Sequence, residues 1–417
     1  MQCNKLREVR GTKDLLGVEL YKFQYIHRLS QSIASRYGFI AVDTPIIEFT
    51  EVFTKTLGDD SDIVTKEMYN FQDKSGENIT LRPEFTSAIV RVLINKNLVV
   101  PVKLFSSGPV FRYERPQKCR QRQFHQVNCE FFGSDLPLAD VEMIALGYNI
   151  LSELNLLDNI TLEINFLGDK ETMSSYRLSL IEYLNNYKKH LSEDSQRRLV
   201  INPLRILDSK APEDREILLN APSISHFYNK YSNDFFMEVL NGLDELCIPY
   251  KINHNIVRGL DYYCNTVFEF TTSKLGSQNA VVAGGRYDGL VKFMGGNDIP
   301  AVGFAMGVER VSALIDYKHQ EPRSVVLMPI GKNAMSHALR LAYELRCKGI
   351  SVHWNYKSTS LKNALRKVDD NSIVLIFGDE ELQSDTIQVK DMKTGKQQEI
   401  VKCDLLDLLY KKFNNNC

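Results

Sequence analysis

Residues 111–133 read FRYERPQKCRQRQFHQVNCEFFG, and the stretch changes character halfway along. Its first half, residues 112–122, carries five cations against one acid, which predicts a positively charged loop. Residues 124–131 then alternate with the period of a strand, so Gln126 and Glu130 point to the same face. The sequence therefore predicts a strand that presents an amide and a carboxylate beside a cationic turn. Such a surface suits a phosphate-rich ligand next to a small polar one.

The composition is that of an ordinary globular protein. The chain has 417 residues and a formal net charge of −1, and its length favours two or three domains. No secretory signal and no membrane helix are expected, because no apolar run approaches the roughly 18 residues that a membrane helix needs. The eight cysteines are scattered, without a Cys-x-x-Cys pair or a zinc-like cluster. Reduced thiols and a cytoplasmic location are therefore expected.

Apolar periodicity predicts helices and strands before residue 316. Helices are expected at 19–37, 87–95 and 138–154, and strands at 39–45, 68–71, 79–82, 159–166, 250–257, 267–270 and 280–283. A charged, helix-rich segment at 169–230 interrupts the strands and indicates an inserted helical module. After a polar linker at 316–323, strands and helices alternate, which predicts a small α/β domain with a largely parallel sheet.

Glu84 and Thr86 occupy the junction between a predicted strand and a predicted helix. Such junctions commonly hold ligand-binding groups. The alternative is that both residues only cap the helix, and the residues by themselves favour capping.

Two glycine-containing stretches follow later in the chain. Gly284 and Gly285 join a predicted strand to a helix, where they either permit close backbone approach or simply form a turn. Residues 301–311 predict a small-residue strand that enters a helix carrying Arg310. An arginine there is commonly a solvated surface charge, but the glycine-lined strand before it favours a ligand.

Several familiar nucleotide-binding motifs are missing from the sequence. It contains no G-x-x-x-x-G-K-[ST] loop, no G-x-G-x-x-G after a strand and no protein-kinase motif set. A phosphate ligand would therefore be held mainly by side-chain cations. The candidates are Arg112, Arg120, Arg122, Arg258 and Arg310.

These motifs carry a resemblance to a known family. Residues 111–133 resemble the second signature motif of class II aminoacyl-tRNA synthetases, the segment ending at Pro45 resembles the first, and residues 303–310 resemble the third. Residues 258–263 and 283–289 resemble the two histidine-specific motifs of the histidyl-tRNA synthetases. The chain is thus similar to that family over nearly its whole length.

The resemblance implies an architecture of three parts. A class II catalytic domain of α+β type, with an antiparallel sheet flanked by helices, would cover residues 1–320. A helical insertion domain near the tRNA acceptor stem would interrupt it at 169–230, and an α/β anticodon-binding domain would cover 323–417. A cytoplasmic homodimer with the Pro45 region at its interface is also implied.

The family pattern also implies roles for individual residues. The histidine substrate would be held by Glu84, Thr86 and Gln126 at its α-amino end and by Glu130 and Tyr263 at the imidazole, with Tyr287 lining the same pocket. The catalytic arginines would be Arg258 and Arg112, at the histidine carboxylate and the α-phosphate, while Arg120 and Arg310 would serve the ATP phosphates and the purine side. Mg²⁺ bridging the ATP phosphates is implied, but the sequence does not identify its ligands.

The implied reaction has two steps and needs no protein nucleophile. Histidine reacts with ATP to give the adenylate and pyrophosphate, and arginines stabilise the charge that accumulates on the phosphoryl oxygens. The 3′ end of tRNA(His) then accepts the histidine. Buried groups that read both imidazole edges supply discrimination of about 10⁴, so no editing domain is expected.

Two departures and two alternatives qualify this interpretation. Cys119 and Phe85 stand where many members of the family have glycine. The main alternative is the non-catalytic, synthetase-like regulatory subunit of ATP phosphoribosyltransferase, and a second is an RNA- or kinase-associated binding module. The retained Arg112, Arg258 and Arg310 disfavour both alternatives, and the domain after Arg323 also disfavours the first.

Overall fold

The protein is described from a computed structural model that covers residues 6–57, 61, 63–117, 119–257, 262–276, 279–319, 322–354 and 361–414. The chain divides into two compact units, Met1–Tyr317 and Lys318–Cys417. Each unit has its own sheet and its own buried core. No helix among the described residues is long and apolar enough to cross a membrane.

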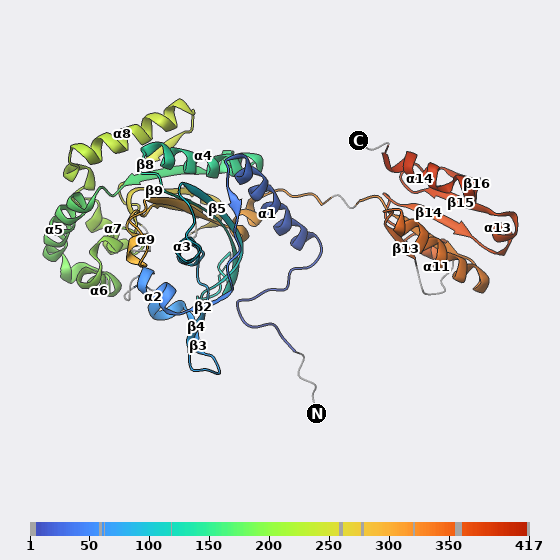
Figure 1. Ribbon diagram of the computed structural model, residues 1–417, viewed down its shortest axis with the longest axis horizontal. Coiled ribbons are helices and arrows are strands. Elements are labelled where there is room, and N and C mark those ends of the chain that lie inside the picture. Colours follow the sequence, from blue (N-terminus) through green and yellow to red (C-terminus); the bar gives the residue numbers. More distant parts are fainter. Residues whose placement is uncertain are drawn as a thin grey trace. The chain divides into compact units, whose positions relative to one another are not determined.

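An eight-stranded sheet forms the centre of the first unit (Figure 1). Its strands, in spatial order, are β1 (Ile40–Ala41), β5 (Val102–Phe111), β6 (Gln123–Phe132), β11 (Ala301–Gly307), β10 (Ala280–Arg286), β9 (Cys264–Thr271), β7 (Thr161–Phe166) and β8 (Tyr250–Ile252). Neighbouring strands run antiparallel except at the two edges, where β1 pairs with β5 and β8 with β7 in parallel. The predicted antiparallel sheet is confirmed.

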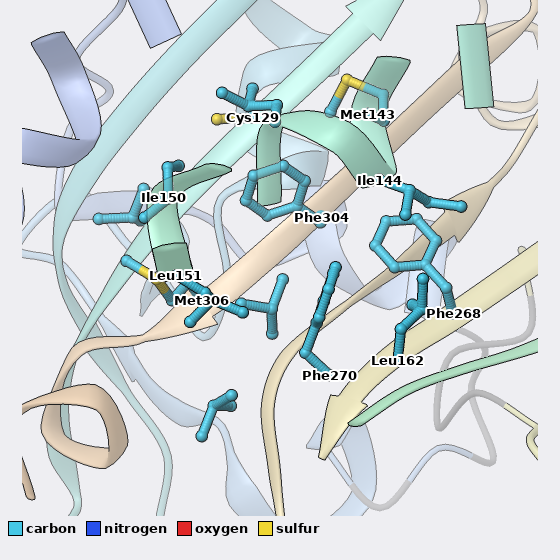
Figure 2. Close-up of a cluster of buried hydrophobic side chains, with 14 of the residues drawn as sticks. Cys129, Met143, Ile144, Ile150, Leu151, Leu162, Phe268, Phe270, Phe304 and Met306 are labelled. Carbon is cyan, nitrogen blue, oxygen red and sulfur yellow. The ribbon is translucent and has the colours of Figure 1, made fainter. Parts of the chain in front are cut away.

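Helices cover one face of this sheet. These are α1 (Val18–Arg36), α4 (Pro137–Glu153), α8 (Lys230–Glu245) and α10 (Val308–Leu314). Figure 2 shows Ile144 and Leu151 of α4 beside Phe304 and Met306 of β11. On β6 the residues that join this core are Val127 and Cys129, so the alternate residues of that strand point to the other face.

The other face carries a smaller apolar cluster around α3 (Thr86–Asn95) and α9 (Leu290–Phe293) (Figure 1). Phe85 and Ile89 pack there against Leu104 of β5 and Tyr287. A second sheet has the strand order β2 (Ile47–Phe49), β4 (Asn78–Leu81) and β3 (Tyr69–Gln72). Helix α2 (Glu51–Leu57) follows β2 in the chain, and β4 leads into α3. The predicted hairpin before α3 is confirmed.

Between β7 and α8 the described chain is helical, with α5 (Lys170–Asn186), α6 (Glu193–Ile201) and α7 (Pro212–Leu218). These helices build a separate apolar cluster that includes Tyr176, Leu180 and Leu184. The carboxylate of Asp214 accepts hydrogen bonds from the hydroxyls of Ser192 (2.7 Å) and Ser195 (2.6 Å), which ties α7 to the start of α6. The segment is thus helical as predicted, while its status as a domain with its own role stays a prediction.

Gly284 and Gly285 lie inside strand β10 rather than in a turn, so the expected end of this strand at residue 283 was wrong. Gly284 stands opposite Phe304 of β11, and a Cβ atom on it would overlap the carbonyl oxygen of Gly303. The glycine is therefore needed for close backbone approach, the first of the two sequence-based alternatives.

The second unit holds a five-stranded sheet in the order β13 (Val352–Trp354), β12 (Val325–Pro329), β14 (Ile373–Phe377), β15 (Thr386–Asp391) and β16 (Gln397–Val401). Its helices are α11 (Lys332–Cys347), α12 (Leu361–Leu365), α13 (Asp379–Ser384) and α14 (Leu405–Asn414). The first three strands are parallel, but β15 and β16 are antiparallel, so the prediction of a largely parallel sheet was wrong for this half. The connection at 392–396 is too short for the crossover that parallel strands require.

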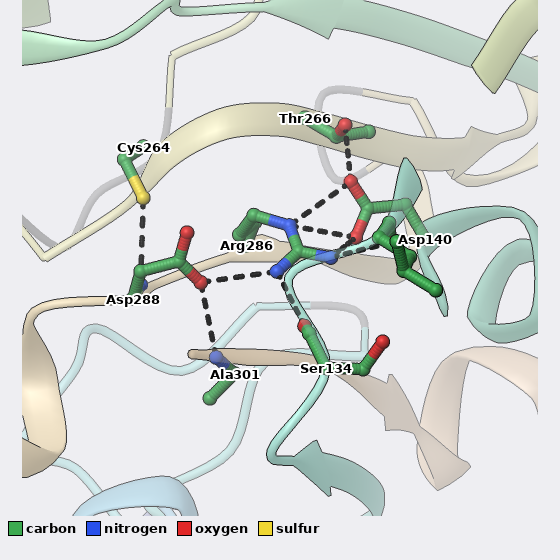
Figure 3. Close-up of polar contacts among 8 residues, drawn as sticks. Ser134, Asp140, Cys264, Thr266, Arg286, Asp288 and Ala301 are labelled. Carbon is green, nitrogen blue, oxygen red and sulfur yellow. Dashed lines mark hydrogen bonds and ion pairs between the residues drawn. The ribbon is translucent and has the colours of Figure 1, made fainter. Parts of the chain in front are cut away.

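A fully buried ion pair joins three elements of the first unit (Figure 3). The Arg286 guanidinium at the end of β10 donates to Asp140 Oδ1 of α4 at 2.6 Å and to the carbonyl oxygen of Ser134 at 2.8 Å. Thr266 of β9 donates its hydroxyl to Asp140 Oδ2 at 2.6 Å. Every oxygen of the buried carboxylate therefore has a donor, which is the condition under which a buried pair holds a structure together.

We expect Asp140→Asn to lower the free energy of unfolding by about 3 kcal/mol, because the substitution leaves the buried Arg286 charge without its main counter-ion. Urea unfolding followed by circular dichroism measures the change. The control is Asp298→Asn, which breaks the Lys292–Asp298 pair, whose side chains are 65% and 66% exposed. That change should be below about 1 kcal/mol. Equal effects of the two substitutions would contradict the assigned role of the buried pair.

Candidate active site

A cavity of about 470 Å³ opens on the face of the central sheet that α3 borders. Seven of the ten residues predicted for the site line it: Glu84, Thr86, Arg112, Arg120, Gln126, Tyr263 and Arg310. Two more, Glu130 and Tyr287, are hydrogen-bonded to each other, and Glu130 also accepts a hydrogen bond from Thr86, which stands in the cavity wall. The tenth, Arg258, lies outside the described residues. Sequence reasoning therefore identified residues that the fold brings together from four separated segments.

Strand β6 supplies the floor of the cavity. Gln126, Asn128 and Glu130 alternate with the core residues Val127 and Cys129, as the sequence predicted for Gln126 and Glu130. Glu130 is only 1% exposed. One strand thus buries an apolar row in the helical core and turns a polar row to the other face, where Gln126 and Asn128 line the cavity.

Three neighbours define the environment of the Glu130 carboxylate. The Thr86 hydroxyl donates to Oε1 at 2.6 Å, and the Tyr287 hydroxyl donates to Oε2. Across the β6–β11 pair stands Gly303, where a Cβ atom would overlap Oε2. The carboxylate therefore fits only because β11 has no side chain at this position.

Burial raises the pKa of Glu130 to about 8, and the nearby charge of Glu84 acts in the same direction. The hydrogen bonds from Thr86 and Tyr287 stabilise the ionised form and limit the shift. Near neutral pH this carboxyl group therefore holds a proton, whose place an N–H donor could take.

Glu84 and Thr86 differ in helix capping, although both line the cavity. The Glu84 carboxylate accepts the backbone N–H groups of Thr86 at 2.5 Å and Ser87 at 2.9 Å, which caps the start of α3. Thr86, the first residue of α3, directs its hydroxyl to Glu130 instead. The capping interpretation is confirmed for Glu84, and both residues also line the cavity.

Arg112, Arg120 and Arg310 line the cavity and lie close enough for their charges to interact. Arg112 Nε donates to the carbonyl oxygen of Pro83 at 2.9 Å, and Arg310 Nη1 donates to that of Ala280 at 2.5 Å. Arg120 pairs with Glu114. Burial lowers the pKa of Arg310, and the charges of Arg112 and Arg120 lower it further. Like charges gathered in this way have the chemistry to bind an anion such as a phosphate chain.

One further candidate, Arg122, and the two departures from the family pattern, Phe85 and Cys119, have different surroundings. Arg122 does not line the cavity, and its guanidinium carbon lies 3.9 Å from the centre of the Tyr113 ring. Phe85 is buried in the apolar cluster, with the Arg82 guanidinium 4.1 Å from its ring centre. Cys119 does line the cavity and has a φ of 58°, a conformation that favours glycine.

The cavity also contains residues that sequence reasoning missed. Asn128 has the same strand parity as Gln126 and Glu130, so its signal was available. Glu309 accepts the His125 backbone N–H at 3.0 Å and lies 3.0 Å from His125 Nδ1, which fastens α10 to β6. Arg198 and Arg205 come from the helical segment between β7 and α8, and nothing in the sequence indicated that they reach the cavity.

Comparisons with known proteins agree with this site. The family model of histidyl-tRNA synthetase matches residues 11–170 and 179–311, and the model of the anticodon-binding domain matches residues 324–412. A protein of Ehrlichia chaffeensis described as a histidine–tRNA ligase is 87% identical to the chain over 413 residues. These are 99% of this chain and 100% of that protein.

Two solved structures extend the comparison. The structure of an apo histidyl-tRNA synthetase from S. aureus matches with a TM-score of 0.81 at 30% identity, and the match covers 97% of this chain and 99% of that one. A Bacillus halodurans protein described as an ATP phosphoribosyltransferase regulatory subunit/histidyl-tRNA synthetase matches with a TM-score of 0.65 at 20% identity over 90% of this chain and 98% of that one. The second match shows a shared fold alone.

We expect the free energy of unfolding to decrease as the pH rises from about 4.5 to about 8, because Glu130 ionises over this range. The group binds its proton more tightly in the folded chain, so ionisation on raising the pH favours unfolding. Glu130→Gln should remove this part of the pH dependence. The free energy of unfolding of the variant should therefore lie closer to that of the wild type at pH 8 than at pH 5.

Unfolding free energies from urea titrations at pH 5, 6.5 and 8 measure this difference. Glu153→Gln, an exposed carboxyl on α4, serves as the control and should keep the pH profile of the wild type. A constant difference between wild type and Glu130→Gln at the three pH values would contradict the prediction.

Proposed function

The chain belongs to the histidyl-tRNA synthetase family, and on this premise we propose that it works as a histidine–tRNA ligase. It activates histidine with ATP and transfers it to the 3′ end of tRNA(His). One observation carries the proposal for this site: a buried carboxyl group, Glu130, is hydrogen-bonded to Thr86 in the wall of a cavity that three arginines also line.

In the activation step the histidine carboxylate attacks the α-phosphorus of ATP. A new oxygen–phosphorus bond forms, the bond to the β-phosphate breaks, and pyrophosphate leaves. Arg112 and Arg258 stabilise the negative charge on the α-phosphoryl oxygens, and Arg120 and Arg310 bind the ATP phosphates and the purine side. The hydroxyl of the tRNA end then attacks the adenylate carbonyl and releases AMP.

Histidine is selected at the Glu130 end. An imidazole N–H donates to the Glu130 carboxylate, and Tyr263 binds the other ring nitrogen, with Tyr287 holding Glu130 in place. Glu84, Thr86 and Gln126 bind the α-amino end. An amino acid without the ring N–H leaves a buried acceptor unpaired, so discrimination of about 10⁴ follows without an editing domain.

Magnesium accompanies ATP in this proposal. No set of three or more His, Cys, Asp or Glu side chains suitable for a metal ion exists among the residues that the structure describes. A Mg²⁺ ion held chiefly by ATP phosphates needs only one or two protein carboxylates. Glu67, Glu114 and Glu309 line the cavity and can supply them. Held there, the ion would supply positive charge that offsets the negative charge of the leaving pyrophosphate.

The remaining parts of the proposal concern the second unit and the location of the protein in the cell. The second unit, which matches the anticodon-binding domain, binds the anticodon of tRNA(His). A location in the cytoplasm accords with a role in protein synthesis, and fractionation of cells would test it. The tRNA bases that the unit reads would be found by charging assays with substituted tRNA(His).

The alternative of a non-catalytic regulatory subunit is disfavoured. The Ehrlichia chaffeensis protein, which matches 99% of this chain, is described as a ligase, and the similarity to the Bacillus halodurans protein extends only to the fold. The cavity also retains Arg112 and Arg310, which a subunit that only binds histidine does not need.

Pyrophosphate exchange with each of the twenty amino acids tests the activity. We expect exchange with histidine alone, and absence of exchange with histidine would favour the regulatory subunit. Arg258→Ala should abolish the exchange, while histidine binding measured by calorimetry largely survives because Glu130 and Gln126 remain. Undiminished exchange by this variant would contradict the role of Arg258.

We also propose that the chain forms a homodimer through the region around Pro45. Strand β1 is an edge strand, and large apolar side chains near it are exposed, among them Ile40 (57%), Ile47 (50%) and Phe49 (51%). Exposed apolar side chains next to an open strand edge are suited to a second copy of the chain.

Sedimentation equilibrium should give twice the chain mass of 47.8 kDa. The double substitution Ile47→Lys and Phe49→Glu should shift the protein toward the monomer, because each change places a charge in the apolar contact. Leu178→Glu, at a 70% exposed position on α5, is the control and should stay dimeric. A wild-type mass of one chain would contradict the proposal.

A further inference from the structure

Asn128 combines deep burial with an unused hydrogen-bond acceptor. The residue is 1% exposed and lines the cavity, yet its Oδ1 atom has no hydrogen-bond partner among the described residues. Buried side-chain oxygens are ordinarily paired, so an unpaired one that borders a cavity indicates a missing donor. Gln126, two residues earlier on the same strand face, also has an unpaired buried oxygen, Oε1.

The sheet register explains why Asn128 can reach the cavity. Its neighbours across the sheet are Ala305 on β11 and Ser106 on β5, and both have small side chains. The helical core lies on the other face, where Val127 and Cys129 point. The space above Asn128 is therefore left open to the cavity rather than filled by apolar side chains.

The two ends of the Asn128 amide have different surroundings. A hydrogen bond from this side chain to the Glu130 carboxylate counteracts the effect of burial on the pKa of Glu130. The carboxylate is an acceptor, so the amide nitrogen faces it. The oxygen is then the end left to interact with a ligand.

The chemistry of histidine decides which of its groups suits this oxygen. Its carboxylate is an acceptor and is excluded. Its ring has two nitrogens, which the proposed function gives to Glu130 and Tyr263. Its α-ammonium has three N–H donors and gains most from several nearby oxygens.

We propose that Asn128 is a substrate-binding residue of the amino-acid subsite. Its Oδ1 accepts a hydrogen bond from the α-ammonium group of the bound amino acid, beside the Oε1 atom of Gln126. This proposal rests on the proposed function for the identity of the amino acid. The two oxygens bind the ammonium on the β6 floor, which directs the substrate carboxylate toward the arginines.

The test is Asn128→Ala in the full chain, assayed by histidine-dependent pyrophosphate exchange. Loss of a hydrogen bond to a charged group should raise the KM for histidine by about tenfold or more, with the KM for ATP unchanged. The inhibition constant of 3-(imidazol-4-yl)propanoate, which lacks the α-amino group, should not change. Asn149→Ala, on α4 and outside the cavity, is the matched control and should resemble the wild type.

An unchanged KM for histidine would overturn the proposal. Equal weakening of histidine and the deamino analogue would also overturn it, because the oxygen would then serve the ring or the shape of the pocket. Lowered thermal stability with unchanged KM values would indicate instead a structural water between Asn128 and the unpaired hydroxyl of Ser106, and would count against the proposal.

A second variant covers the case in which Asn128→Ala does not fold. Asn128→Ser keeps a small polar side chain but lacks the amide oxygen, and it should show the same split between histidine and its analogue. If neither variant folds, Asn128 is structural and the proposal fails. Calorimetric binding of histidine to wild type and variants tests Asn128 even if the wild type shows no exchange, so the two proposals can fail separately.

Discussion

A carboxyl group buried within a β-sheet depends on both space and donors, and the Glu130 side chain obtains each from a different element. Gly303 of β11 leaves the space, while Thr86 at the start of α3 and Tyr287 after β10 donate to the two oxygens. The same contacts fix how these elements approach one another. The recognition end of the cavity is therefore a packing arrangement of the fold, which explains why its members are so far apart in the sequence.

The two ends of the cavity follow opposite electrostatic rules. At Glu130, burial without a permanent counter-ion favours the neutral form and raises the pKa. At Arg310, burial together with two neighbouring guanidinium groups lowers the pKa and makes the positive form less favourable than in water. A ligand that brings N–H donors to one end and negative charge to the other relieves both conditions, which histidine and ATP together do.

Local patterns in the sequence predicted a large part of this structure. The alternation from 124 to 131 gave the strand and the shared face of Gln126 and Glu130, and the absence of glycine-rich nucleotide loops pointed to arginines. Contacts between distant segments were less accessible: neither the need for Gly303 beside Glu130 nor the approach of Arg198 and Arg205 has a local signature. The antiparallel β15–β16 pair was missed because alternating elements alone do not give strand direction.

The contact between Gly303 and Glu130 also limits how this sequence can drift. Any side chain at position 303 would collide with the Glu130 carboxylate, and its Cβ atom would also lie only 2.8 Å from the carbonyl oxygen of Cys129. A shorter residue at position 130 would remove only the first of these two clashes, so the backbone of β6 itself restricts position 303. A side chain at position 303 would thus require two changes at once, one in the Glu130 side chain and one in the spacing of β6 and β11, so the glycine is protected by the sheet itself.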